Sequence, residues 1–106
     1  MGLSSHQMVV DNRLLAIEEL LRQRKQVAAC KELEVLSEEE FRGDALNQGV
    51  YLLLRSESFL PSADYRTIIE FGLRAYRLLA DSAENRRFGQ LQWVLSQTAT
   101  KRRLQT

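Results

Sequence analysis

The side chains that most often perform catalysis are scarce in this chain. It has one histidine, His6, close to its N-terminus, and one cysteine, Cys30, inside the apolar run Val27-Ala28-Ala29-Cys30. An active site needs a nucleophile, a base and a group that stabilises charge, all held together, and these two residues do not supply such a set. We therefore predict that the protein is not an enzyme and has no catalytic residues.

Metal and cofactor sites have equally little support. A lone cysteine cannot form an internal disulfide, and it cannot bind zinc without further ligands. The acidic run Glu38-Glu39-Glu40 is consecutive, so on a helix its side chains point in different directions and chelate one ion poorly. The chain also has no glycine-rich phosphate loop. We predict no metal and no cofactor, and we interpret Arg42-Gly43-Asp44, an adhesion tripeptide, as a coincidence at a helix start.

Basic residues in the second half point to one alternative function, nucleic-acid binding. Phosphates attract cationic side chains, and bases stack on aromatic rings such as that of Trp93. The sequence pI of about 7.9 is nevertheless well below the value above about 9 that is typical of a dedicated nucleic-acid-binding domain. The residues for this alternative are Arg86, Arg87, Lys101, Arg102 and Arg103.

The charge is distributed unevenly along the chain. Residues 1–53 contain six Lys/Arg and nine Asp/Glu, a balance of −3, and residues 54–106 contain nine and five, a balance of +4. The sum is the net charge of +1. Such polarity can steer partners or favour head-to-tail association, although it is also typical of solvated helix surface. A homodimer is also one of our expectations, because self-association would cover the apolar surface that the helices leave exposed.

The elements that must position these residues are predicted to be helices throughout. Pro61 is the only proline, and apolar residues recur at three- and four-residue spacing through most of the chain. We predict an all-α fold of about five helices in antiparallel pairs, either a right-handed stack or a small helical bundle. We expect a flexible segment at 1–10, one helical domain at 11–98 and a basic tail at 99–106.

Local signals indicate where the helices begin and end. Asp11 or Asn12 can cap the first helix, and the polar run Arg22-Gln23-Arg24-Lys25-Gln26 predicts a tight turn near Arg24 rather than one long helix. Ser37 to Glu40 has the form of a capping box. Gly43 suggests that the following helix begins at Asp44, and Ser62 or Asp64 can cap the helix after Pro61.

The sequence also bears on the compartment. No apolar stretch approaches the roughly 20 residues that a transmembrane helix needs, and the N-terminus lacks the basic-then-apolar pattern of a signal peptide. A single cysteine fits a reducing compartment. We therefore expect a cytoplasmic protein that does not contact a membrane.

A weak self-match appears when the chain is shifted by forty residues. Gly49 to Ser56 then falls on Gly89 to Ser96, and Ile68, Leu73 and Tyr76 fall on Ala28, Leu33 and Leu36. Gly49, Gly72 and Gly89 lie inside expected helices, where each costs about 1 kcal/mol relative to alanine. We interpret such glycines as places where two helix backbones approach closely.

With this period the chain resembles the tetratricopeptide class of helical repeats. Gly49 and Gly89 are similar to the small residue midway along the first helix of a repeat, and Ala75 is similar to the alanine late in a second helix. The resemblance covers about residues 11–98, without the family's opening tryptophan or closing proline. It implies a protein-binding module, and it places the groove residues at Leu46, Val50, Leu53, Arg86, Gln90 and Trp93.

The function that we expect is capture of a partner helix or peptide in an apolar groove with a polar rim. The run Val50-Tyr51-Leu52-Leu53-Leu54 has more large apolar residues than one buried stripe can use, which adds Tyr51 to the candidate contacts. The partner that we expect is therefore another protein. With such a partner, this protein would act as an adaptor or regulatory subunit. The alternative, that Tyr51, Leu53 and Trp93 belong to the core, stays open.

Overall fold

The computed structural model describes residues 9–62, 64–80, 89 and 92–100. All regular structure within these ranges is helical, so the prediction of an all-α fold is confirmed. The elements are α2 (Asn12–Arg22), α3 (Gln26–Val35), the 3₁₀ turn η1 (Glu38–Phe41), α4 (Ala45–Ser58), the 3₁₀ turn η2 (Leu60–Ser62) and α5 (Tyr65–Leu79). Residues 92–100 form a further helical segment.

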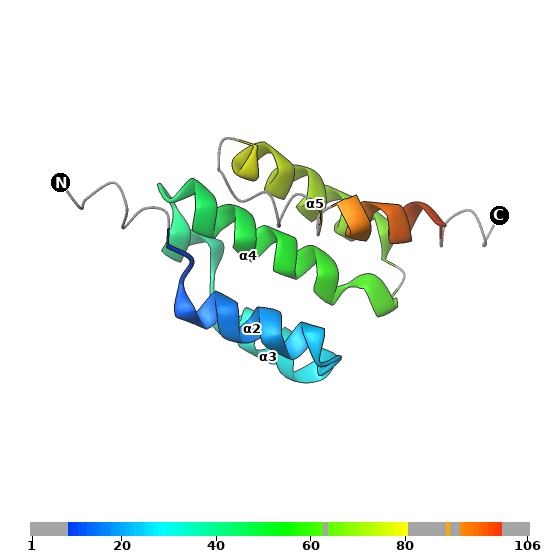
Figure 1. Ribbon diagram of the computed structural model, residues 1–106, viewed down its shortest axis with the longest axis horizontal. Coiled ribbons are helices and arrows are strands. Elements are labelled where there is room, and N and C mark those ends of the chain that lie inside the picture. Colours follow the sequence, from blue (N-terminus) through cyan, green and yellow to red (C-terminus); the bar gives the residue numbers. More distant parts are fainter. Residues whose placement is uncertain (1–8, 63, 81–88, 90–91, 101–106) are drawn as a thin grey trace.

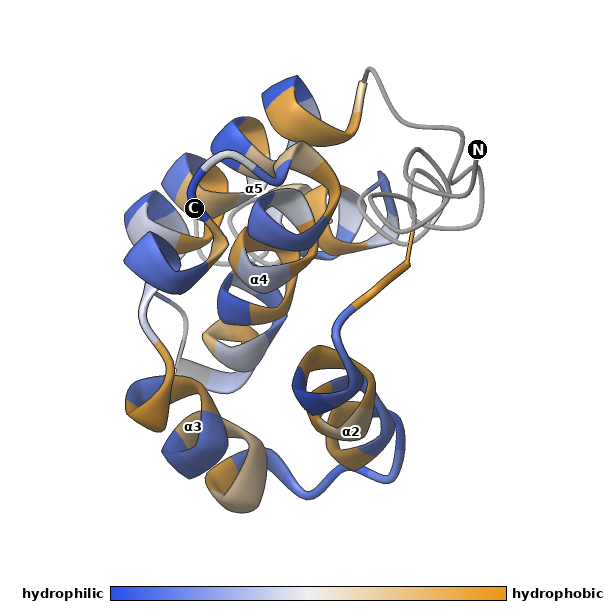
Figure 2. Ribbon diagram, turned by 90° about the vertical axis from the view of Figure 1, so that its left-hand side faces the viewer, coloured by the Kyte–Doolittle hydropathy of each residue, from blue (hydrophilic) through white to orange (hydrophobic). Residues whose placement is uncertain are grey.

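The helices form antiparallel pairs around α4. In Figure 1, α2 and α3 form one hairpin, and α4 and α5 form another that lies above it. Figure 2, viewed nearly along the helices, shows α2 and α3 side by side on one side of α4 and α5 on the other. No helix within the described ranges is both long and apolar enough to cross a membrane.

The central position of α4 explains its composition. All five residues of the run Val50–Leu54 are buried, and Leu46 is buried one turn earlier. A helix that is apolar on nearly all sides is stable only when neighbours cover it on several sides. Here α5 covers one side, and α2 with α3 covers the other.

Aspartates begin three of the described helices, α2, α4 and α5. The side chain of Asp11 accepts a hydrogen bond from Arg13 N–H, that of Asp44 from Asn47 N–H, and that of Asp64 from Thr67 N–H. Each bond satisfies an N–H group that has no partner within its own helix. The predicted helix starts near Asp11, Asp44 and Asp64 are confirmed.

The polar run between α2 and α3 forms the predicted turn. Arg24 has a φ of 63°, in the left-handed region, and Lys25 N–H donates to the Leu20 carbonyl at 2.8 Å. Ser37 and Glu40 also form a capping box, with Ser37 N–H donating to Glu40 Oε2 at 3.0 Å. This box begins the short turn η1 rather than a long helix, because Gly43, at a φ of 86°, separates η1 from α4.

The contact between α4 and α5 is close at Gly49. A Cβ atom added there would lie 2.8 Å from Cγ and Cδ2 of Leu79 and 3.3 Å from Cβ of Leu78. About two turns further along α4, the buried Ser56 hydroxyl donates to the Ile68 carbonyl at 2.8 Å. The interpretation of Gly49 as a point of close helix approach is confirmed. At Gly89 an added Cβ would meet nothing within 4 Å.

Candidate functional site

A groove runs between the α2–α3 hairpin and the helical segment 92–100, over the C-terminal end of α4. Its volume is about 840 Å³. This lies within the range of about 300–1,000 Å³ that is typical of ligand-binding clefts. Residues from α2, the α2–α3 turn, the start of α3, the end of α4, η2 and segment 92–100 line it: Leu15, Glu18, Glu19, Leu21, Arg22, Arg24, Gln26, Glu57, Leu60, Pro61, Trp93 and Gln97.

Apolar side chains from three places in the sequence contribute to this groove. Leu15 of α2 is 39 % exposed and Trp93 is 53 % exposed, although both are large and apolar. Leu60 and Pro61 of η2, which come between Leu15 and Trp93 in the sequence, also line the groove. A set of exposed apolar residues gathered in one concavity is typical of a binding surface, whereas single exposed residues are common on any protein.

The structure of α2 explains why Leu15 faces the groove. Leu14 and Ile17 are buried in the core, and Leu15 follows Leu14 directly. Successive residues on a helix point about 100° apart, so the two leucines cannot both face the core. This adjacency of two leucines is a signal in the sequence, but it does not reveal which other element faces Leu15.

The rim of the groove carries charges of both signs. Glu18, Glu19 and Glu57 contribute negative charge, and Arg22 and Arg24 contribute positive charge. Gln23 Nε2 donates to Glu19 Oε2 at 2.8 Å, and Arg22 forms an ion pair with Glu19 Oε1. These hydrogen bonds, from Gln23 first and then Arg22, lower the pKa of Glu19 below its ordinary value. The Glu19 side of the rim is therefore charged at neutral pH.

The end of the groove near α3 is fixed by an amide. Gln26 Nε2 donates to the carbonyls of Glu57 and Ser58, both at 3.2 Å. These carbonyls lie in the last turn of α4, beyond the hydrogen bonds between residues four apart within the helix, and the N–H of Phe59 at the C-cap also donates to the Glu57 carbonyl. Cys30 is half-buried nearby, with its Sγ 3.9 Å from the Ser58 carbonyl. The start of α3 is thus held against the end of α4.

The contact residues predicted from the sequence lie in different environments in the structure. Trp93 lines the groove. Leu46, Val50, Tyr51 and Leu53 lie in the core, which is the alternative that the sequence left open for Tyr51 and Leu53. They do not form a surface in this structure, because α4 is covered on both sides. Arg86 and Gln90, and the basic residues Arg87, Lys101, Arg102 and Arg103, lie outside the described residues, as does His6.

The acidic run of η1 binds several partners within the protein. Glu38 pairs with Arg74 of α5 and accepts from Gln48 Nε2, Glu39 pairs with Arg42, and Glu40 pairs with Arg13. The three carboxylates therefore point in different directions, as the sequence indicated. Within the described ranges no group of three or more His, Cys, Asp or Glu side chains is placed to hold a metal ion.

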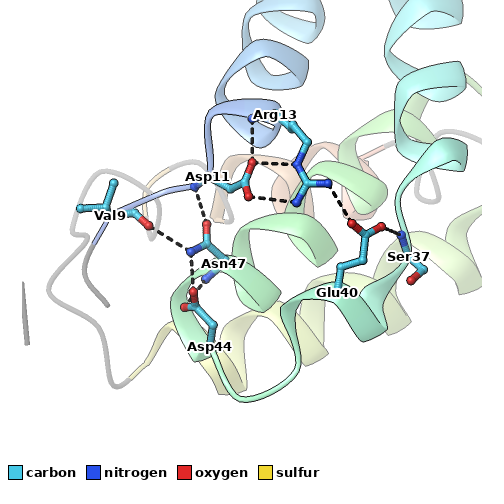
Figure 3. Close-up of polar contacts among 7 residues, drawn as sticks. All are labelled: Val9, Asp11, Arg13, Ser37, Glu40, Asp44 and Asn47. Atoms are coloured by element: carbon cyan, nitrogen blue, oxygen red, sulfur yellow. Dashed lines mark hydrogen bonds and ion pairs between the residues drawn. The ribbon is translucent and has the colours of Figure 1, made fainter. Parts of the chain in front are cut away.

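A network of polar contacts joins the start of α2 to the start of α4, at the end of α2 opposite the α2–α3 turn (Figure 3). The buried Asn47 accepts from Asp11 N–H at 2.6 Å, and its Nδ2 donates to the Val9 carbonyl at 3.0 Å and to Asp44 Oδ2 at 2.6 Å. Arg13 bridges Asp11 and Glu40 at 3.0 and 2.8 Å. All of these groups bind one another, so we interpret the network as structural.

Comparison with known proteins gives no relative. No protein-family model, curated protein or solved structure matches the chain. The function that we propose therefore rests on the groove.

Proposed function

We infer that this protein is a non-enzymatic interaction module that captures a helix or peptide of a partner protein in the groove between α2 and segment 92–100. The observation that carries this proposal is the pair of exposed apolar side chains, Leu15 and Trp93, in a groove of about 840 Å³. Covering them with apolar side chains of a partner removes apolar surface from water, at about 25 cal/mol per Å².

Trp93 is the strongest candidate for an anchor of such a complex. Tryptophan is among the residues that most often dominate binding energy, because its large ring gains much from burial. Both neighbouring elements of the groove are helices, and an amphipathic helix can place residues at three- and four-residue spacing between them. We therefore propose an amphipathic helical segment as the occupant.

The charged residues of the rim indicate which charges the occupant should carry. Three glutamates and two arginines line the groove, so its formal charge is −1. A partner segment with basic residues beside its apolar stripe complements the excess of acid. This rim also disfavours phosphate at the groove, so the alternative function, nucleic-acid binding, would use other residues.

The resemblance to tetratricopeptide repeats implies the same class of function, because modules of that class bind proteins in a groove between helices, but the groove proposed here is lined by Leu15 and Trp93 rather than by the buried Leu46, Val50 and Leu53. As part of this proposal we describe the protein as a cytoplasmic adaptor or regulatory subunit. Its partner is another protein.

The proposal is tested by comparing two matched variants, Leu15→Ser in the groove and Val9→Ser on an exposed site outside it. Each protein is used to capture partners from lysate, with and without nuclease. We expect a captured protein that is lost with Leu15→Ser and kept with Val9→Ser, because only Leu15 contacts the occupant. We expect nuclease to have no effect.

The single tryptophan provides a direct second measurement. An amphipathic peptide from the captured protein should shift Trp93 fluorescence to shorter wavelength, since burial removes the indole from water. Loss of every captured partner on nuclease treatment, with Leu15→Ser binding as well as wild type, would instead support the nucleic-acid alternative. That binding would also weaken steeply with salt, unlike burial of Leu15 and Trp93.

A further inference from the structure

Arg55, in the last turn of α4, carries a charge that the described residues do not pair. Its side chain is half-buried, and its Nε is wholly buried without a hydrogen-bond acceptor. The guanidinium group forms no hydrogen bond and no ion pair with any residue in the described ranges. A buried donor without an acceptor is rare in proteins and costs stability, so this side chain requires an explanation.

Two phenyl rings hold this guanidinium group in place. Its Cζ lies 5.7 Å from the ring centroid of Phe59, at the C-cap of α4, and 5.5 Å from that of Phe71 on α5. The two rings are nearly parallel, with an interplanar angle of 8° and centroids 6.1 Å apart. Aromatic rings attract a cation as a whole, which explains why the arginine lies here. They are poor substitutes for the oxygen acceptors that guanidinium N–H groups bind.

Carboxylates on two elements packed against α4 are bound to other arginines. Glu38 of η1 forms an ion pair with Arg74, and Glu70 of α5 lies 3.7 Å from Nε of Arg66. Each of these pairs is neutral as a whole, so neither balances the charge of Arg55. The negative end of the α4 dipole favours a cation in this turn, but a dipole gives the guanidinium nitrogens no acceptor.

We propose that Arg55, held by Phe59 and Phe71, is a binding site for a carboxylate group of a ligand. Nε is the one guanidinium nitrogen that is wholly buried without an acceptor, so the carboxylate binds end-on to the two terminal nitrogens. A planar carboxylate accepts two parallel hydrogen bonds from this fork, and its single negative charge balances the single positive charge. A phosphate dianion instead favours a cluster of arginines.

The rings make Arg55 a better receptor than an arginine that is free in solution. They shield part of the guanidinium group from water and restrict its motion, so a carboxylate displaces less water and orders fewer torsions when it binds. Two charge-assisted hydrogen bonds at such a site correspond to a dissociation constant on the order of 10 mM for a small carboxylate. Arg55 does not line the groove, so this site and the proposed function can fail independently.

The test is an NMR titration of the full chain with sodium acetate, in which sodium chloride keeps the ionic strength constant. The Nε–H signal of Arg55 is identified by its loss in Arg55→Gln, and the exposed Arg77 of α5 is the internal control. We expect a saturable shift at Arg55, with acetate bound at least about threefold more tightly than at Arg77.

Two further probes distinguish the sources of the carboxylate. N-acetylaspartate amide represents an acidic side chain of a partner protein, and N-acetylasparagine amide is its uncharged control. Tighter binding of the aspartate derivative than of acetate would identify such a side chain as the ligand. Equal binding of the two would identify a small carboxylate. The asparagine derivative should not bind in either case, because it lacks the charge.

Three variants complete the experiment, with backbone amide signals as the readout and circular dichroism as the check of folding. Arg55→Gln should need at least about tenfold more acetate. Phe71→Leu keeps an apolar side chain but removes one ring, so it should bind acetate at least about threefold more weakly. Leu15→Ser, in the groove, should bind acetate like wild type.

The wild-type comparison decides the proposal even if Arg55→Gln does not fold. The proposal is overturned if acetate shifts the Arg55 signal no more than that of Arg77. It is also overturned if inorganic phosphate binds at Arg55 more tightly than acetate does, or if the asparagine derivative binds as tightly as the aspartate derivative.

Discussion

At the scale of single residues, Asn47 is the clearest case of a buried polar side chain that organises the chain around it. Its amide satisfies Asp11 N–H, the Val9 carbonyl and the Asp44 carboxylate, which belong to two segments far apart in sequence. A buried amide is tolerated only when such partners are present. Asn47 thereby fixes the start of α2 against the start of α4.

We expect Asn47→Ala to lower the free energy of unfolding by about 1–3 kcal/mol, because Asp11 N–H and the Val9 carbonyl lose their partner. Urea unfolding at neutral pH measures this change. Asn12→Ala, at an exposed neighbouring position, is the matched control and should differ little from wild type. Equal effects of the two substitutions would show that the network contributes nothing.

At the scale of elements, the packing of α4 against α5 depends on the absence of a side chain at Gly49. Leu79, whose side chain would meet an added Cβ at 2.8 Å, is itself fully buried and has little room to move. Gly89 resembles Gly49 in the sequence, yet it has open space around it. Two similar glycines therefore differ in what they contribute to packing.

We expect Gly49→Ala to be destabilising by about 1 kcal/mol net, because overpacking costs about 1–3 kcal/mol and the gain in helix propensity is only about 1 kcal/mol. Gly89→Ala has no such clash, so its stability should be unchanged or slightly higher. Thermal unfolding of both variants measures these changes in stability. A stabilised Gly49→Ala variant would mean that α5 can shift away from α4 at little cost.

At the scale of the whole molecule, stability depends on pH through the ion pairs that join η1 to α2. Hydrogen bonding to Arg13 is the main cause that lowers the pKa of both Asp11 and Glu40 below their ordinary values. In the window below about pH 4–5, the unfolded chain thus binds more protons than the folded chain. The stabilisation is complete above the unfolded pKa values and is lost as the pH falls through the folded ones.

We expect Arg13→Gln to be less stable than wild type at pH 7, and we expect this difference to shrink as the pH falls through the lowered pKa values of Asp11 and Glu40, because protonated carboxyls no longer pair with Arg13. Urea unfolding from neutral to acidic pH measures the difference. Arg66→Gln removes the same charge from an exposed arginine whose Nε lies 3.7 Å from Glu70, and it serves as the control. A difference for Arg13→Gln that does not change with pH would assign its effect to packing on Phe41, whose ring lies 5.6 Å away.

The forty-residue self-match illustrates how far a pattern of residue types can predict structure. It aligns Leu33 with Leu73 and Leu53 with Trp93, and both pairs are large and apolar. In the structure the first member of each pair is fully buried and the second is about half exposed. All of these segments are helices with large apolar residues at helical spacing, whereas burial depends on which neighbour covers each face.

The sequence by itself determined the helical class, the turn at Arg24 and the helix start at Asp44. These features depend on backbone conformation and hydrogen bonds between residues within about one helical turn, so neighbouring residues are sufficient to encode them. Only the tertiary structure decided that Tyr51 and Leu53 lie in the core while Leu15 and Trp93 line a groove. That outcome depends on α4 being covered on two sides by segments distant in sequence, and residue spacing within one helix does not specify such neighbours.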